Sequence, residues 1–215
     1  MIRRLADRGR AFVLAVPVAI AIVFTSAADV AAKARPQLSA LFGGPFTLVD
    51  HKGIERTALS FRGHFMLVNF GYTYCPDICP TALTTLAVAL DRLGPAAAAV
   101  QPIFITVDPA RDTSDQLAGY VSAFHPRLIG LTGSEAQIRG AAKAYRVHRS
   151  KILIPGEATE DYLVNHSSLT FLMDRQGQFV TMFPHGTDAD FMAAAIRRHM
   201  AEEPAQTGRQ AEAAN

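Results

Sequence analysis

Cysteine is scarce in this 215-residue sequence, and net charge is nearly absent. The chain has two cysteines, and its 21 Lys and Arg residues against 19 Asp and Glu leave a formal net charge of +2. So small an excess of positive charge does not suggest a nucleic-acid partner. Thiol chemistry can come only from Cys75 and Cys79, which lie close together in the sequence.

Large apolar residues are missing from residues 202–215. A segment of this kind cannot bury enough apolar surface to hold a fold, so we expect a disordered tail there. The chain as a whole is 49% hydrophobic, which is enough for one substantial core. We therefore expect one domain over residues 36–201, preceded by a separate N-terminal segment over residues 1–35.

The N-terminal segment has an apolar run, residues 11–24, after an arginine-rich start. This pattern is typical of membrane targeting. Because the run is short for a full span, it is either a cleavable signal or an anchor whose residues 25–28 lie in the membrane interface. Asp7 and the immediate apolar run favour a bacterial inner-membrane protein, with its domain facing the periplasm, over a mitochondrial presequence.

The two cysteines lie where a strand pattern turns into a helical pattern. Residues 65–70 form a mainly apolar run that predicts a buried strand, and leucines recur at helical spacing from Leu83 to Leu93. Cys75 and Cys79 are therefore expected at a helix N-terminus. Backbone N–H groups and the helix dipole at such a position stabilise a thiolate and lower the pKa of a cysteine.

The spacing of the cysteines permits a disulfide or a shared metal ion. A Cys-x-x-Cys pair is typical of a thioredoxin-type dithiol, and the extra residue here leaves room for a metal and a third ligand. A static disulfide is the alternative, although a bridge across so short a loop gains little from loop-closure entropy.

Three motifs follow one another along the chain. They are Gly-Tyr-Thr-Tyr-Cys-Pro-Asp-Ile-Cys-Pro at 71–80, Val-Asp-Pro-Ala-Arg-Asp-Thr at 107–113 and Tyr-Leu-Val-Asn-His-Ser at 162–167. In order and spacing they resemble the Sco/SenC family of copper-binding, thioredoxin-like proteins of cytochrome c oxidase assembly. The resemblance covers roughly residues 40–200 and favours an uncleaved membrane anchor at the N-terminus.

His166 is the third metal ligand that the resemblance implies, beside Cys75 and Cys79. Two thiolates and one imidazole form a soft donor set that suits copper as Cu(I) or Cu(II), whereas a structural zinc site normally has four protein ligands and no obvious fourth is present. His185 is the second candidate among the histidines. Asn165 stands where many relatives carry an aspartate, so the surroundings of the imidazole are expected to differ.

Further charged residues lie near these positions. For Asp108, Arg111 and Asp112 the resemblance suggests partner contact or bracing of the metal loop. The alternative is that Asp112 caps a helix and Arg111 pairs with a neighbouring carboxylate. Asp77 either stabilises the helix start by its charge or shapes the loop for docking.

The order of elements predicts an α/β thioredoxin-like sandwich that opens with a β-hairpin. We expect the hairpin over 46–60, a strand–helix–strand unit from 65 to 107, a helix after Thr113, and a short strand at 128–131. A capping box at Ser134 and Gln137 should open a helix that runs to Tyr145. An extended excursion over 147–161, a second hairpin over 168–183 and a helix capped by Asp188 complete the domain.

The resemblance implies a membrane-tethered copper chaperone that helps to assemble the dinuclear copper site of cytochrome c oxidase. Its expected partners are the copper-site subunit of the oxidase, a copper donor protein and the membrane. The alternative is a thiol–disulfide oxidoreductase that uses Cys75 and Cys79 to keep the copper-site cysteines of that subunit reduced. A thiol peroxidase is less favoured, because both cysteines lie within one turn flanked by prolines.

Overall fold

A computed structural model of the chain describes residues 41–156, 158 and 161–212. The strands are β1 (Thr47–Asp50), β2 (Glu55–Thr57), β3 (Phe65–Gly71), β4 (Val100–Thr106), β5 (Ile129–Thr132), β6 (Arg149–Leu153), β7 (Tyr162–His166), β8 (Leu169–Met173) and β9 (Phe179–Pro184). The α-helices are α2 (Ile78–Leu93), α3 (Ser114–Ser122), α4 (Glu135–Ala144) and α5 (Ala189–Glu212), and the 3-10 helices are η1 (Ala58–Phe61) and η2 (Gly94–Ala99).

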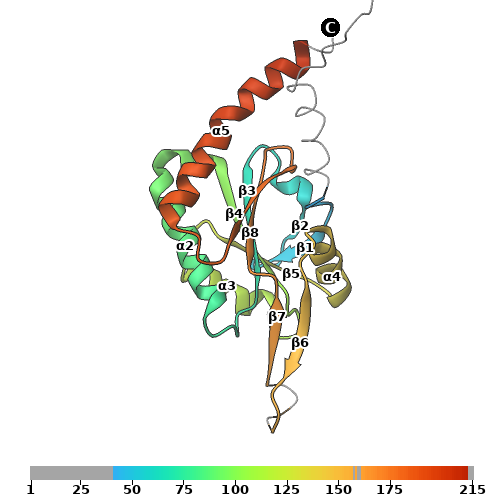
Figure 1. The fold of residues 1–215 in the computed structure, drawn as a ribbon. Helices are drawn as coiled ribbons and strands as arrows, with labels where there is room; N and C mark the ends of the chain where they lie inside the picture. Colours follow the sequence, from blue (N-terminus) through green and yellow to red (C-terminus); the bar gives the residue numbers. More distant parts are fainter. Residues whose placement is uncertain (1–40, 157, 159–160, 213–215) are drawn as a thin grey trace, which may run out of the picture.

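Seven of these strands form one mixed sheet in the order β2-β1-β5-β4-β3-β8-β9 (Figure 1). Strand β3 pairs in parallel with β4 and antiparallel with β8, and β4 pairs in parallel with β5. The predicted N-terminal hairpin is present as β1 and β2, paired from Thr47 opposite Thr57. The α/β sandwich predicted from the sequence is therefore confirmed.

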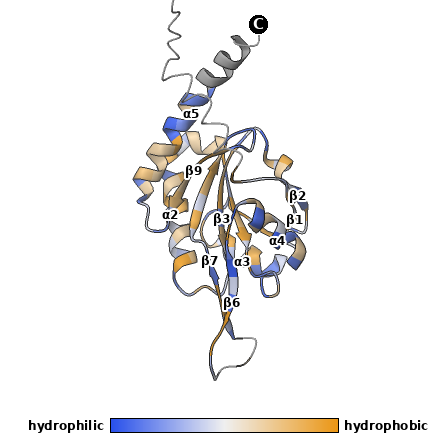
Figure 2. Cartoon of the chain, turned by 45° about the vertical axis from the view of Figure 1, so that its right-hand side comes forward, coloured by the Kyte–Doolittle hydropathy of each residue, from blue (hydrophilic) through white to orange (hydrophobic). Residues whose placement is uncertain are grey.

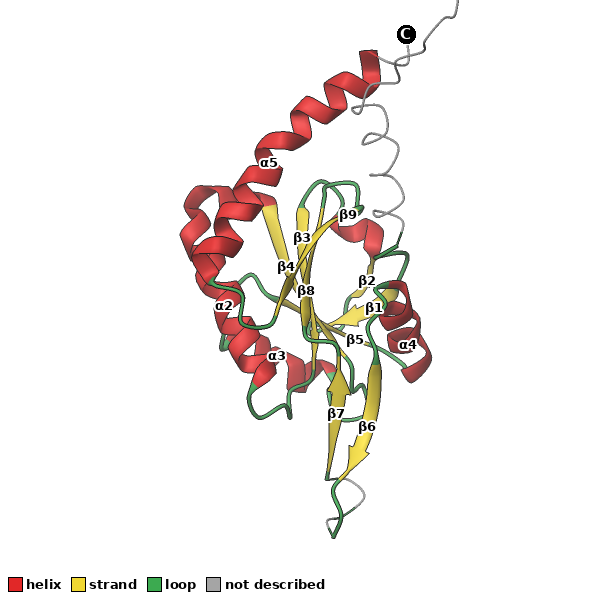
Figure 3. Ribbon diagram, viewed as in Figure 1, coloured by secondary structure: helices red, strands yellow, loops and turns green. Residues whose placement is uncertain are grey.

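Strand β3 lies at the centre of the core, and all seven of its residues are buried. Because successive side chains of a strand point to opposite faces, β3 supplies both sides of the sheet. Phe65 and Leu67 pack with α2 and α5, whereas Met66, Val68 and Phe70 pack on the side that α4 covers. Figure 3 shows α2 and α3 on one side of the sheet and α4 on the other.

The helix starts follow the predicted capping chemistry. The Ser134 hydroxyl accepts a hydrogen bond from the Gln137 backbone N–H, and the Gln137 side chain accepts one from the Ser134 N–H, so the predicted capping box opens α4. Thr113 caps α3 by accepting from the Gln116 backbone N–H. The Asp112 carboxylate, which the sequence offered as a possible cap, accepts hydrogen bonds from Thr73 and Thr106 instead.

Helix α5 extends farther than the sequence led us to expect. It continues to Glu212, where a disordered tail from residue 202 was expected. This segment mixes good helix formers, namely alanine, glutamate, glutamine and arginine, with Pro204 and Gly208, which oppose helix, so propensity alone does not explain its backbone. The ion pair between Arg175 and Glu203, at 2.8 Å, also ties this part of α5 to the turn between β8 and β9.

The expected excursion after α4 is a hairpin of its own. Strands β6 and β7 form a separate two-stranded sheet that projects from the domain (Figures 1 and 2). Its register places Arg149 opposite His166 and Leu153 opposite Tyr162. Strand β7 thus carries His166 from the projecting hairpin back to the main sheet.

The described residues include no helix that is long and apolar enough to cross a membrane. The expected membrane segment, residues 1–35, lies outside them and stays a prediction.

Candidate copper site

Cys75 and Cys79 occupy the turn from β3 into α2, as predicted. The Cys75 backbone N–H donates to the Tyr72 carbonyl at 3.3 Å, and the Cys79 backbone N–H, in the first turn of α2, donates to the Cys75 sulfur at 3.4 Å. Both cysteines are free thiols. Cys79 is buried and Cys75 is partly exposed, so the pair has an inner and an outer sulfur.

The two sulfurs share one proton at neutral pH. Hydrogen bonds from the Cys79 thiol, the His166 side chain and the backbone N–H groups of Cys79 and Asp77 lower the pKa of Cys75 to about 3, against the opposing effect of its partial burial. The same interaction, together with burial, raises the pKa of Cys79 well above its usual range. The outer sulfur is therefore a thiolate and the inner sulfur is a thiol.

The low pKa predicts an unusual pH profile for alkylation of Cys75. In the reduced, metal-free protein, iodoacetamide should modify Cys75 at a rate that is nearly constant from about pH 5 to 8, because the reactive thiolate is already fully formed. An ordinary cysteine would react about tenfold faster per pH unit over most of that range. Mass spectrometry of the alkylated peptide measures the rate.

Cys79→Ala is the matched variant for this measurement. It removes the largest cause of the low pKa of Cys75, so the alkylation rate should then rise with pH. A wild-type rate that climbs with pH as steeply as that of a free cysteine would contradict the assignment.

His166 lies beside the inner sulfur. Its Nε2 atom is 3.4 Å from the Cys79 sulfur, and its Nδ1 atom is 3.1 Å from the Ser167 carbonyl oxygen. Nε2 therefore faces the cysteine pair, where it can bind a metal ion, and Nδ1 faces the backbone. The ring also packs edge-on against buried Tyr72, with centroids 6.0 Å apart.

His166 is the last residue of β7. Asn165 is exposed and, by strand alternation, points to the face opposite His166. The orientation of the imidazole is therefore set by the Ser167 carbonyl. His185 follows β9, donates its backbone N–H to the Ser168 carbonyl at 3.1 Å, and lines a small hollow with Asn69 and Ala82.

Asp112 braces the cysteine turn and does not cap α3. Its buried carboxylate accepts hydrogen bonds from the Thr73 backbone N–H at 3.1 Å, the Thr73 hydroxyl at 2.6 Å and the Thr106 hydroxyl at 2.6 Å. Burial raises the pKa of this carboxyl group, and the hydrogen bonds to Thr106 and Thr73 oppose that effect. The carboxylate thus fixes the turn to the end of β4.

Asp108 and Arg111 join the cysteine turn to β7. Asp108 accepts from the Tyr162 hydroxyl at 2.7 Å and from Arg111 Nε at 2.5 Å. The Arg111 guanidinium lies 3.7 Å from the Tyr162 ring centroid and 4.7 Å from that of Tyr74. Arg111 therefore pairs with a neighbouring carboxylate, which was one of the two roles expected from the sequence. It also contacts both the strand of His166, through Tyr162, and the turn of Cys75, through Tyr74.

Gly71 and Thr73 were not singled out by the sequence as parts of the site. A Cβ atom on Gly71 would lie 3.0 Å from the Cys79 sulfur and 2.7 Å from Phe104 Cε2, so glycine leaves room for the inner sulfur. Thr73 matters through Asp112, which is 39 positions away in the sequence. Both residues lie in the first motif, but nothing local in the sequence indicates these contacts.

The donor set fits copper. Two sulfurs and an imidazole nitrogen come from a short turn and a strand end that Asp112, Asp108 and Arg111 hold in place. Among the described residues, no three His, Cys, Asp or Glu side chains already form a closed metal site. Cys75, Cys79 and His166 are the residues that would hold the ion.

Curated relatives share this part of the chain. A cow protein named SCO2 homolog, mitochondrial, is 44% identical over 160 residues, which cover 74% of this chain and 59% of the relative. The human protein of the same name is 42% identical over 160 residues, with 74% and 59% covered. The fission yeast protein sco1 is 42% identical over 163 residues, with 75% and 60% covered. The chain thus spans about three fifths of the length of these relatives.

Solved structures agree with the fold. The copper-bound structure of Arabidopsis thaliana ScoI has a TM-score of 0.70 and 40% identity, covering 75% of this chain and 99% of that one. The copper-bound structure of Bradyrhizobium japonicum ScoI has a TM-score of 0.67 and 41% identity, covering 73% and 98%. The prediction of copper as the metal is confirmed by these structures, and the thioredoxin-like prediction by the fold they share.

The predicted bacterial inner-membrane location with a periplasmic domain is contradicted by the relatives. The cow, human and Arabidopsis proteins carry a mitochondrial location in their names. The physical reason for the error is that an arginine-rich start before an apolar run is compatible with both kinds of targeting segment. A single residue, Asp7, is too weak a signal to separate them.

The family profile described as SCO1/SenC matches residues 34–201, which is most of the sequence. That match covers the cysteine turn, the Asp112 brace and the strand of His166. Together with relatives above 40% identity, it shows that this chain belongs to the SCO1/SenC family.

Proposed function

We propose that this chain is a copper chaperone that holds one copper ion on Cys75, Cys79 and His166. It passes the ion to the dinuclear copper site of cytochrome c oxidase. The observation that carries the proposal is the 3.4 Å contact between the Cys79 sulfur and His166 Nε2, which joins residues 87 positions apart. The copper bound to solved relatives supports the choice of metal.

The inner and outer sulfurs suit transfer of a metal ion. Cys79 and His166 hold the ion from the protein side, where Gly71 and Tyr72 pack around them. Cys75 is partly exposed, so donor atoms of a partner can reach the ion from solvent. Copper bound by few ligands can accept an incoming ligand before it leaves the first set. The N-terminal segment would tether the domain to a membrane, near the copper-site subunit and a copper donor protein.

Copper titration of the reduced protein tests this function. Wild type should bind one ion tightly under anaerobic conditions, in competition with a chelator. His166→Ala should weaken binding by at least about 10-fold, as even loss of an outer partner of a metal ligand commonly costs 10- to 100-fold. His64→Ala is the matched control, because that exposed histidine precedes β3, at the end of the strand opposite the cysteine turn, and its loss should leave the affinity unchanged. Equal affinity in wild type and His166→Ala would contradict the proposal.

A second function is favoured by the unequal protonation of the cysteines. The partly exposed Cys75 thiolate can attack a partner's disulfide sulfur, so that an S–S bond breaks and a mixed disulfide forms. The Cys79 sulfur then attacks the Cys75 sulfur of the mixed disulfide, so that a Cys75–Cys79 disulfide forms and the second partner sulfur is released. One partner sulfur takes the Cys79 proton and the other takes a proton from water, so the partner leaves as a dithiol. The chain would serve as a thiol–disulfide reductase for copper-site cysteines. Dithiol exchange that persists in His166→Ala while copper affinity falls would separate this activity from copper delivery.

A further inference from the structure

A second hollow lies beside the copper site, between α4 and β6. Its volume is about 700 Å³, and it is open to solvent. Small apolar side chains line part of it, namely Ala110, Ala142, Val147 and Val164. Arg139, Lys143, Arg149 and Lys151 supply positive charge, and Glu135 is the carboxylate among its lining residues. We call this hollow the basic cleft.

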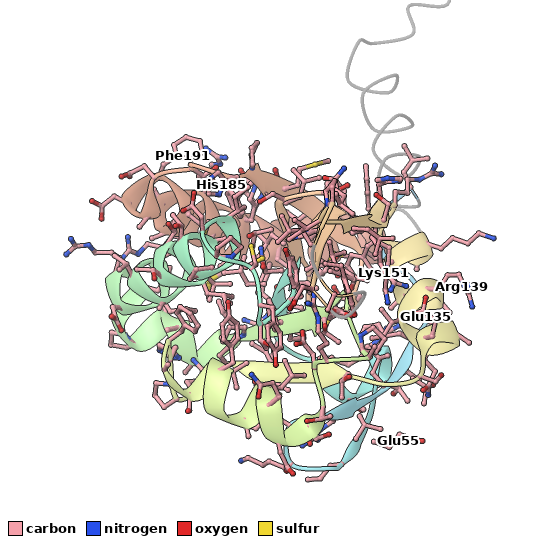
Figure 4. All side chains as sticks on the ribbon, turned by 90° about the horizontal axis from the view of Figure 1, so that it is seen from below. Glu55, Glu135, Arg139, Lys151, His185 and Phe191 are labelled. Carbon is pink, nitrogen blue, oxygen red and sulfur yellow. The ribbon has the colours of Figure 1, made fainter. Side chains whose placement is uncertain are left out.

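The carboxylate does not cancel the positive charge of the basic cleft. Glu135 is held by Arg149 through two hydrogen bonds of 2.6 and 3.0 Å. This pair lowers the pKa of Glu135, to which Arg139 and Lys151 add smaller effects. The cleft therefore keeps three exposed cations, Arg139, Lys143 and Lys151, beyond the one that pairs with Glu135. Figure 4 shows Glu135, Arg139 and Lys151 gathered on one side of the molecule.

The basic cleft is continuous with the strand that carries His166. Lys151 pairs with Val164 and Arg149 pairs with His166 in the β6–β7 register. Because cross-strand partners share a face, both cations lie on the same face of the hairpin as the imidazole. Lys151 Nζ also lies 4.1 Å from the ring centroid of Tyr162, whose hydroxyl binds Asp108. Anything bound in the cleft would thus lie next to the copper site.

We propose that the basic cleft binds an acidic segment of the protein that exchanges copper with this chain. This inference rests on the proposed function. The cations come from both α4 and β6 and lie along an open, partly apolar surface. Such a spread suits an extended peptide with several carboxylates better than a single compact anion. Positive charge beside the metal site would attract the partner and set its orientation before transfer.

The test uses the full chain, reduced and metal-free in a non-ionic detergent, with a fluorescein-labelled hexaglutamate peptide as the probe. Fluorescence anisotropy should show binding that weakens as salt is added. The double variant Arg139→Glu with Lys151→Glu should bind the peptide at least about tenfold more weakly, because two attractions become repulsions. Lys52→Glu with Arg198→Glu changes the net charge equally at exposed positions elsewhere, and should lose less than about twofold.

The outcomes distinguish specific binding in the basic cleft from general attraction to the chain. Equal losses in the two double variants would show general attraction to the chain and would overturn the proposal, as would absence of peptide binding. Tripolyphosphate that displaces the peptide and binds more tightly would make the cleft a small-anion site instead. Copper titration of the Arg139→Glu, Lys151→Glu variant should match wild type. If the wild-type chain does not bind copper, the proposed function is refuted. The peptide measurement uses metal-free protein, so it tests the basic cleft independently of copper binding.

Discussion

Replacement of Cys75 by serine is expected to abolish one-to-one copper binding. Serine has nearly the size of cysteine, but its hydroxyl is a hard donor that stays protonated, whereas Cys75 offers a thiolate whose pKa is about 3. Removal of a charged ligand should cost more than the 10- to 100-fold typical of an outer partner, so affinity should fall by more than about 100-fold. Anaerobic copper titration against a chelator measures this loss.

Cys75 is the better position for this experiment because it is partly exposed, whereas Cys79 is 1% exposed. Cys79→Ser should remove copper binding as well, but it also places a hydroxyl in the core. Ile78→Ala is the control, since Ile78 lies in the same turn and is 40% exposed, and its loss should leave the stoichiometry at one. A Cys75→Ser protein that still holds one tightly bound copper ion would refute the three-ligand site.

Gly71→Ala is expected to lower the free energy of unfolding by about 2–3 kcal/mol, the upper part of the range for overpacking a core. The added methyl group would lie 2.7 Å from Phe104 Cε2 and 3.0 Å from the Cys79 sulfur. Both neighbours are buried, so relief requires a shift of the core or of the inner sulfur. Urea denaturation measures the change in stability, and copper titration shows whether the sulfur has moved.

The control for this variant is Gly140→Ala in α4. A Cβ atom there meets nothing within 4 Å, and alanine favours the helix by about 1 kcal/mol over glycine. The two Gly→Ala changes should thus shift stability in opposite directions. Equal unfolding free energies for the two variants would show that the space around Gly71 is not tight.

The cysteine turn shows how much of the fold and the site can be predicted from local sequence patterns. The apolar run of β3, the helical leucines of α2 and the capping box of α4 are patterns within a few residues, and the structure contains all three elements where they were expected. The position of both cysteines at a helix N-terminus follows from the same patterns. From that position the sequence also predicted that the pKa of a cysteine would be lowered, and the pKa of Cys75 is lowered.

Other features depended on contacts that no local pattern carries. Asp112 was a plausible helix cap by residue type, but the fold brings Thr73 and Thr106 to it, and Thr113 caps the helix instead. The helical path of α5 beyond residue 202 has no apolar pattern in the sequence, and the Arg175–Glu203 pair beside it joins residues 28 positions apart. The location was misjudged because one charge pattern serves two kinds of targeting.

The sequence by itself determined the elements, the pair of sulfurs and, through its motifs, the family and its metal. Those properties depend on spacing within a turn and on the chemistry of single residue types. The tertiary structure alone decided which sulfur is buried, which imidazole nitrogen faces it, and that a basic cleft adjoins the strand of His166. These features arise where β3, β4, α4 and the β6–β7 hairpin meet, because only the folded chain brings such distant residues into contact.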